Sequence, residues 1–106
     1  MLNNMDTNVF SRGCKVWFYS EEQPYTVRCC DDRFVILTKP YKEQNTVLYT
    51  ILDMYCGIRG TDDNQICPGY ETDEECFNVL NKLQTGEFNI SSRNRIILDI
   101  EKYEII

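Results

Sequence analysis

The chain has 106 residues, six cysteines, no histidine and a formal net charge of -6. A chain of this length forms one domain with one hydrophobic core. Its apolar content of 42% and charged content of 26% are ordinary for a folded protein and do not suggest a disordered chain or a membrane protein. The lack of histidine excludes the usual catalytic triads and every histidine-containing metal site.

The acidic excess lies in the C-terminal half of the chain. Residues 1 to 59 hold seven basic and seven acidic side chains, whereas residues 60 to 106 hold four basic and ten acidic ones. Lysine and arginine bind nucleic acids by neutralising phosphates. A nucleic-acid interface is therefore expected only on the N-terminal part.

The first ten residues, MLNNMDTNVF, show neither the basic nor the apolar region of a secretory signal. No apolar run approaches the roughly 20 residues of a membrane-spanning helix. We therefore expect a cytoplasmic protein that is not in a membrane, with its cysteines as free thiols. The cysteines do not form a CxxC pair, so neither a metal nor another cofactor is predicted. They are Cys14, Cys29, Cys30, Cys56, Cys67 and Cys76.

Residues 1–12 are mostly polar and are expected to be flexible, and residues 13–106 are expected to form a single β-rich domain with one helix. The run CKVWFYS alternates as a strand does, with Val16 and Phe18 on one face. Its other face carries Lys15, Trp17 and Tyr19.

The stretch YTVRCCDDRFVILTK predicts a hairpin of two strands, with Asp31–Asp32 as a two-residue turn. Cys29 and Cys30 then lie on opposite faces of the first strand and cannot easily bind one metal ion together. The second strand, residues 33–39, has an apolar centre on both faces. Pro40 is expected to end it.

The segment TVLYTILDMYC predicts another strand, and the glycine-rich segment after it predicts loops with at most a short strand near residues 65–67. Thr72 and Glu75 have the spacing of a capping box, and an apolar stripe then indicates a helix that ends at Gly86.

After the helix, residues 88–90 are expected to be extended, and residues 95–100 to form a strand. The last residues either extend this strand or continue it after a bulge. The predicted fold class is mainly β or α+β. It is a small SH3-like antiparallel barrel or bent sheet, with one helix at about residues 73–85 packed on it.

The segments that carry a family resemblance are VWFYSEEQPYTVRCCDDRFVILTKPY, TVLYTILD, IRGTDD, GYETDEECFNVLNKLQTGE and ISSRN. They resemble a family of small proteins of bacterial genomes, their phages and integrated mobile elements. The resemblance extends from Val9 to Ile100 and implies no particular chemistry. It implies that an accessory or anti-defence protein of a mobile element is a reasonable candidate.

Aromatic and basic side chains alternate on the N-terminal sheet, a pattern that stacks nucleic-acid bases or binds extended peptides. The candidate binding surface consists of Trp17, Tyr19, Arg28, Arg33, Lys39 and Tyr41. The alternative is that Trp17 and Tyr25 are core residues covered by the helix. We favour it for Trp17, since a single tryptophan is often the largest core side chain of a small domain.

An acidic face is also predicted around the start of the helix. Its candidate residues are Asp62, Asp63, Asp73, Glu74 and Glu75. The last three are explained by the preference of a helix N-terminus for negative charge, and solvated loop acids are favoured over a cation site for the first two. In the mobile-element hypothesis, this face binds a basic host surface as a nucleic-acid mimic would.

Two arginines follow a pair of serines in SSRNR and suggest an anion nest. An internal ion pair or turn is the favoured interpretation of Arg93 and Arg95, because acidic residues lie on both sides.

The function expected from the sequence is a non-catalytic cytoplasmic interaction module that binds a protein. The first alternative is a small β-barrel that binds nucleic acid. The second is a protein that binds a small molecule, namely a nucleotide. An enzyme is not expected, since no nucleophile–base pair or metal constellation can be assembled without histidine. The sequence predicts neither the partner nor the oligomeric state.

Overall fold

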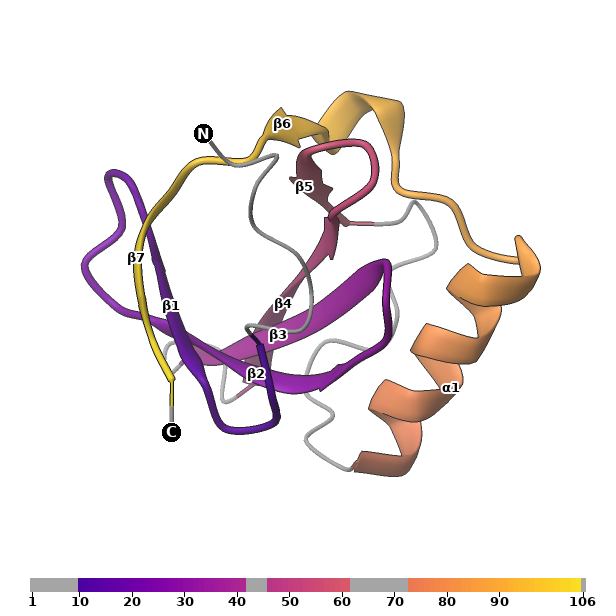
Figure 1. Cartoon of the computed structure of the whole chain (residues 1–106), viewed down its shortest axis with the longest axis horizontal. Helices are drawn as coiled ribbons and strands as arrows, with labels where there is room; N and C mark the ends of the chain where they lie inside the picture. Colours follow the sequence, from indigo (N-terminus) through magenta and orange to yellow (C-terminus); the bar gives the residue numbers. More distant parts are fainter. Residues whose placement is uncertain (1–9, 42–45, 62–72, 106) are drawn as a thin grey trace.

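The structure, a computed structural model, describes residues 10–41, 46–61 and 73–105. In this part of the chain, seven strands form one antiparallel sheet in the order β6-β5-β4-β3-β2-β1-β7. A single α-helix, α1, covers part of one face (Figure 1).

The strands are β1 Lys15–Phe18, β2 Tyr25–Cys30, β3 Phe34–Tyr41, β4 Thr46–Asp53, β5 Ile58–Gly60, β6 Ile96–Ile97 and β7 Ile100–Glu104. The helix α1 is Asp73–Thr85, and a 3-10 turn is Ser92–Asn94. The predicted fold class and helix are confirmed.

The sheet curls into a half-barrel because its two edge strands are consecutive in the chain. β6 and β7 lie at opposite ends of the strand order, and only Leu98 and Asp99 connect them. The Leu98 N–H donates to Gly57 O at 2.9 Å, and Asp99 O accepts from Tyr19 N–H at 3.0 Å. The connection is thus tied to both sides of the curled sheet, and Figure 1 shows β6 and β7 following one another around it.

Two hydrophobic clusters lie on opposite faces of the sheet. The inner cluster fills the curl and includes Val16, Phe18 and Leu37, and the outer cluster lies under α1 and includes Ile36 and Leu80. Residues 34–38 of β3 are all buried, as predicted for a strand covered on both faces. The inner cluster also contains Phe10, so the core begins before Gly13, within the segment expected to be flexible.

The β2–β3 hairpin is confirmed, but its loop has three residues, 31–33, instead of two. The prediction that Pro40 ends β3 is wrong, because Pro40 is paired with Val47 of β4. The pairing of β2 with β3 extends only to Thr38, so Pro40 lies where β3 has a neighbour on one side. A residue without an N–H is tolerated in such an edge position.

Two further predictions about strands need correction. The three-residue strand β5 lies in a segment predicted as loop, where it pairs with β4 and β6. The single strand expected at residues 95–100 is divided into β6 and β7. The predicted short strand at 65–67, the cap residue Thr72 and residues 1–9 lie outside the described residues. No helix in the described part is long and apolar enough to cross a membrane.

Candidate functional site

Trp17 lies on the outside of the curled sheet, not in its core. Val16 and Phe18 on either side of it are fully buried, while Trp17 is half-buried. The Lys102 ammonium of β7 lies 4.7 Å from the centre of the Trp17 ring, and the two residues are paired across the strands. The interpretation of Trp17 as a core residue covered by the helix is therefore wrong, because α1 packs against β2 and β3.

Tyr19 and Tyr25 differ in burial although both flank the turn after β1. Tyr19 directly follows β1 and is 59% exposed. Tyr25 is a core residue, which agrees with the core alternative, but it belongs to the inner cluster and not to the cluster under α1. Its ring packs edge-on against Phe18, with 5.5 Å between the ring centres.

The basic residues of the predicted binding surface are distributed over three separate places. Arg28 is the extra residue of a β-bulge in β2, and its Nη2 lies 3.4 Å from Asp73 Oδ1 at the start of α1. Arg33 is paired with Asp53, and Lys39 Nζ lies 3.0 Å from Glu21 Oε1. The structure does not assemble them beside Trp17. The side chain of Tyr41 is not described.

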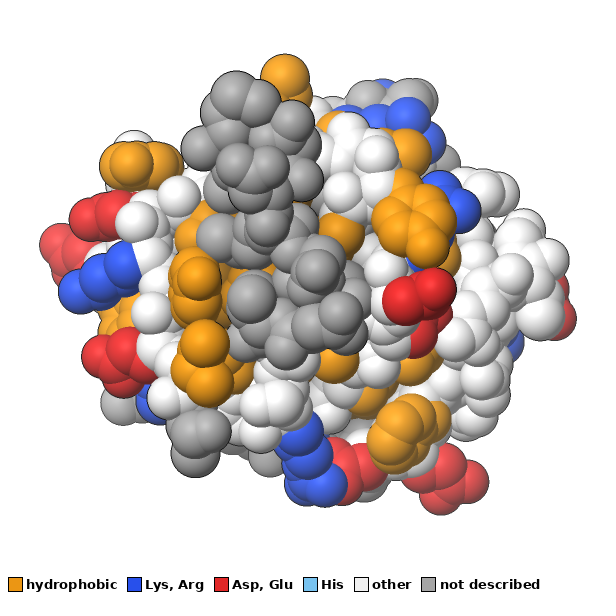
Figure 2. Space-filling model, viewed as in Figure 1, with side chains coloured by type: hydrophobic (Ala, Val, Ile, Leu, Met, Phe, Trp, Pro, Cys, Tyr) orange, Lys and Arg blue, Asp and Glu red, His pale blue; other side chains and the backbone are white. Residues whose placement is uncertain are grey.

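The acidic face is also less uniform than predicted. Asp73 contacts two arginines, because Arg12 Nη1 lies 2.6 Å from its Oδ2 and Arg28 lies near its Oδ1. Glu74 is exposed and Glu75 is half-buried. Asp62 and Asp63 lie outside the described residues. On the face shown in Figure 2, acidic and basic side chains are intermixed, without a continuous patch of one sign.

Buried Asp53 organises the first of two pockets. It is 4% exposed, and its carboxylate accepts hydrogen bonds from Arg33 Nε at 3.0 Å and Arg33 Nη2 at 2.9 Å. The backbone N–H groups of Tyr55 and Cys56 donate to the same carboxylate at 3.1 and 3.3 Å. Burial alone would raise the pKa of Asp53, but the hydrogen bonds from Arg33 and Cys56 outweigh it and lower the pKa.

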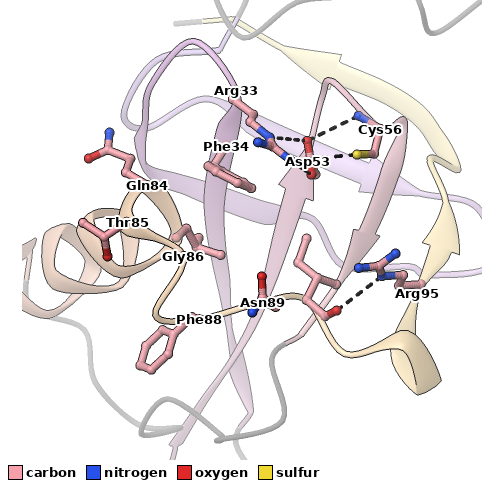
Figure 3. A pocket seen from close by; sticks show the side chains of 12 residues that line it. Arg33, Phe34, Asp53, Cys56, Gln84, Thr85, Gly86, Phe88, Asn89 and Arg95 are labelled. Carbon is pink, nitrogen blue, oxygen red and sulfur yellow. Dashed lines mark hydrogen bonds and ion pairs between the residues drawn. The ribbon is translucent and has the colours of Figure 1, made fainter.

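This first pocket, which we call the α1 pocket, has a volume of about 300 Å³. It lies between the C-terminal end of α1 and the ends of β3 and β4 (Figure 3). Arg33, Asp53 and Cys56 line one side, and Gln84 and Phe88 contribute from the helix end and the segment after it. The Arg33–Asp53 pair is internally neutralised, and Arg95 is the other charged residue in the lining.

The second pocket, the β5 pocket, has a volume of about 420 Å³ and lies at the end of β5. Three arginines line it: Arg59 of β5, Arg93 of the 3-10 turn, and Arg95, which also lines the α1 pocket. Tyr49 and Ile96 contribute apolar surface. Arg93 and Arg95 stand out in the sequence as part of SSRNR, whereas Arg59 is marked only by its position between two glycines in GIRGT.

The side chain of Arg59 is held in place by stacking on an aromatic ring and by two carboxylates. Its guanidinium lies 3.8 Å from the centre of the Phe18 ring. Its Nη2 is 2.7 Å from Glu21 Oε2, and its Nη1 is 3.5 Å from Asp99 Oδ1. Burial opposes ionisation of Glu21, but the bonds from Arg59 and Lys39 outweigh burial and lower its pKa.

The Cys29–Cys30 pair has the orientation predicted for it. Cys29 belongs to the cluster under α1, and Cys30 packs against the inner cluster. Burial raises the pKa of Cys29 to about 12 and also raises that of Cys30, so neither thiol is activated. In the described part of the chain, no three Cys, Asp or Glu side chains gather as metal ligands would.

Comparison with known proteins yields no match to a family model, to a curated protein or to a solved structure.

Proposed function

We propose that this protein is a non-catalytic interaction module of the cytoplasm that binds another protein through the Trp17 face, consisting of Trp17, Tyr19 and Lys102. The observation that supports this most is the position of the single tryptophan outside the core, with Lys102 stacked on its ring. Tryptophan and tyrosine are among the residues that contribute most binding energy at protein interfaces. Stacking on Lys102 restricts the indole before binding, which lowers the entropy cost of association.

A protein partner is favoured over a nucleic acid by the distribution of charge. Arg28, Arg33 and Lys39, which a nucleic acid would need, lie apart and pair with carboxylates. The net charge of -6 adds repulsion of a polyanion. The resemblance to small phage and mobile-element proteins supports a bacterial host protein as the partner.

The acidic-face hypothesis receives less support. Asp73 is balanced by Arg12 and Arg28, so the described part of this face offers less free negative charge than its sequence indicates. A nucleic-acid mimic requires a dense acidic surface. We therefore place the interface on β1 and β7.

The test is affinity capture from nuclease-treated bacterial lysate, followed by measurement of the dissociation constant with the purified partner. Truncating a tryptophan at the centre of an interface is expected to weaken binding by about tenfold or more. We expect this for Trp17→Ser, together with a change of tryptophan fluorescence when the unmodified protein binds. Tyr55→Ser, at a tyrosine that is 68% exposed on the β4–β5 turn, serves as the matched control and should bind normally.

Circular dichroism must show that both variants are folded. A purified partner that binds Trp17→Ser as tightly as the unmodified protein would contradict the proposed interface. Capture that occurs in untreated lysate but is lost after nuclease treatment would instead support the nucleic-acid alternative.

A further inference from the structure

β7 lies at one end of the strand order and leaves an edge of the sheet without a neighbouring strand in the described part of the chain. It pairs only with β1. No other backbone–backbone hydrogen bond of residues 100–104 occurs within the described residues. In Figure 1, β7 lies on the side of the molecule away from α1. Unpaired backbone groups on an edge strand are a template to which another strand can add.

The backbone groups of β1 alternate between its two neighbouring strands. Cys14 O accepts from Val27 N–H at 2.8 Å, so the carbonyl of Cys14 points to β2. Successive residues of an antiparallel strand direct their N–H and C=O groups to opposite sides. Lys15 and Trp17 therefore direct theirs to β7. Tyr19, two residues further, agrees with this, because its N–H donates at 3.0 Å to the carbonyl just before β7.

The free edge of β7 therefore presents the backbone of Tyr103. Lys15 is paired with Glu104, and Trp17 with Lys102, so the backbone groups of these two β7 residues bond to β1. Tyr103 lies between them, and its N–H and C=O point away from β1. A strand added at this edge would exchange hydrogen bonds with Tyr103.

The exposed side chains of β7 carry charges that the described part of the protein does not neutralise. Glu101, Lys102 and Glu104 are exposed, and none of them forms an ion pair within residues 10–41, 46–61 and 73–105. Charged side chains on an edge strand hinder pairing with an arbitrary strand. They favour a strand whose charges are opposite in sign at the facing positions.

A second copy of the chain provides such a strand. The backbone groups of an added antiparallel strand must face those of Tyr103, which allows Tyr103 to lie opposite Tyr103 of the other copy or two residues to either side. In the first register, Lys102 of each copy lies opposite Glu104 of the other. The two shifted registers place Lys102 opposite Lys102, or Glu104 opposite Glu104. Only the first register joins opposite charges, and it does so twice.

We infer that the protein forms a homodimer in which the β7 strands of two copies pair antiparallel about Tyr103. Two-fold dimers of this kind are the commonest homo-oligomers. The dimer joins the two sheets and places both Trp17 faces on one side, because residues opposite each other in a sheet share a face. Two adjacent faces can bind a partner with two epitopes more tightly than one face can. The dimer does not depend on the proposed protein interface.

The experiment is sedimentation equilibrium of the full chain, from micromolar to millimolar concentration, at low and at high salt. We expect a monomer–dimer equilibrium with a dissociation constant that rises with salt, since exposed charges are screened. Lys102→Glu and Glu104→Lys each place like charges opposite one another at both positions. Each variant should raise the dissociation constant by about tenfold or more.

A mixture of these two variants tests the register itself. A chain with Lys102→Glu matches a chain with Glu104→Lys at both positions, so the mixture should form a heterodimer about as tight as the unmodified dimer. Lys82→Glu is the matched control, since it makes the same charge change on α1, away from β7 (Figure 1). It should dimerise as the unmodified chain does. Circular dichroism must show that every variant is folded.

Hydrogen exchange of the Tyr103 N–H locates the contact. We expect this exchange to slow as the concentration of the protein rises, because the N–H becomes hydrogen-bonded in the dimer. A chain that stays monomeric at millimolar concentration overturns the inference. A dimer that both charge variants form as tightly as the unmodified chain, a mixture that does not restore the dimer, or exchange of Tyr103 that does not depend on concentration would each overturn it as well.

Discussion

Asp53 is the residue whose charge contributes most clearly to the local architecture. It is buried at the end of β4, where it links the β2–β3 loop to the β4–β5 turn through Arg33 and two backbone N–H groups. A carboxylate with these partners stabilises the folded state only while it is ionised. The strand pattern of TVLYTILD alone does not reveal this role.

We predict that Asp53→Asn lowers the free energy of unfolding by about 2 kcal/mol at neutral pH, because charged hydrogen bonds to Arg33 are lost. The pKa of Asp53 is lowered in the folded state, so its stabilisation is present above the ordinary aspartate pKa of about 4 and is lost as the pH falls further. The difference between the two proteins should therefore shrink in acid. Urea denaturation of both proteins over a range of pH measures this difference in the free energy of unfolding.

Asp32→Asn provides the control for this prediction, because it makes the same chemical change at an exposed carboxylate. Its effect should stay within about 0.5 kcal/mol. A difference between Asp53→Asn and the unmodified protein that is as large in acid as at neutral pH would show that the charge of Asp53 is not what stabilises the fold.

At the scale of elements, the β2–β3 hairpin depends on Asp31. Asp31 Oδ1 accepts hydrogen bonds from the N–H groups of Arg33 at 2.7 Å and Phe34 at 2.6 Å. Its Oδ2 accepts from Gln84 Nε2 of α1 at 2.7 Å. One side chain therefore closes the loop and also ties it to the helix.

We predict that Asp31→Ala destabilises the protein by about 2 kcal/mol, since two backbone N–H groups lose their acceptor. Asp32→Ala should cost less than about 0.5 kcal/mol, because its contact is a 3.3 Å hydrogen bond from Tyr55 on the surface. Urea denaturation of the two variants measures their free energies of unfolding against that of the unmodified protein. Equal losses of stability would show that the turn does not depend on the Asp31 carboxylate.

Local patterns predicted the elements that have strong periodicity. Alternation placed Val16 and Phe18 together on one face of β1, and the apolar stripe placed α1 correctly. β5 was missed because a strand of only three residues, the last of them a glycine, carries no period, and the strand forms through its pairing with β4 and β6. Local sequence cannot show such partners.

The candidate site was harder to predict because it depends on where the elements pack. Alternation groups Lys15 with Trp17 but does not tell which face the helix covers. The bulge at Arg28 and the separate ion pairs of Arg33 and Lys39 divided the predicted surface. The β5 pocket likewise joins Arg59 to Arg95, which are far apart in the sequence.

At the scale of the whole molecule, the C-terminal segment holds the curled sheet together. Leu98 and Ile100 place their side chains in the inner cluster, although they belong to a segment that runs from one edge of the sheet to the other. Because this segment joins the two edges of the sheet, its packing contributes directly to keeping the half-barrel curled. Its contribution should therefore appear in the unfolding of the entire domain.

We predict that Leu98→Ala destabilises the protein by about 2–4 kcal/mol, because it leaves a cavity in the inner cluster. Ile97→Ala should cost less than about 0.5 kcal/mol, since Ile97 is 77% exposed, whereas Leu98 is 6% exposed. Urea unfolding followed by Trp17 fluorescence and by circular dichroism measures both variants.

If the segment joins the edges as described, the two probes should report one shared transition for Leu98→Ala, at a lower urea concentration than in the unmodified protein. A loss of the fluorescence transition alone would show that β1 and β7 separate while the rest of the sheet stays folded, which would contradict a single cooperative half-barrel.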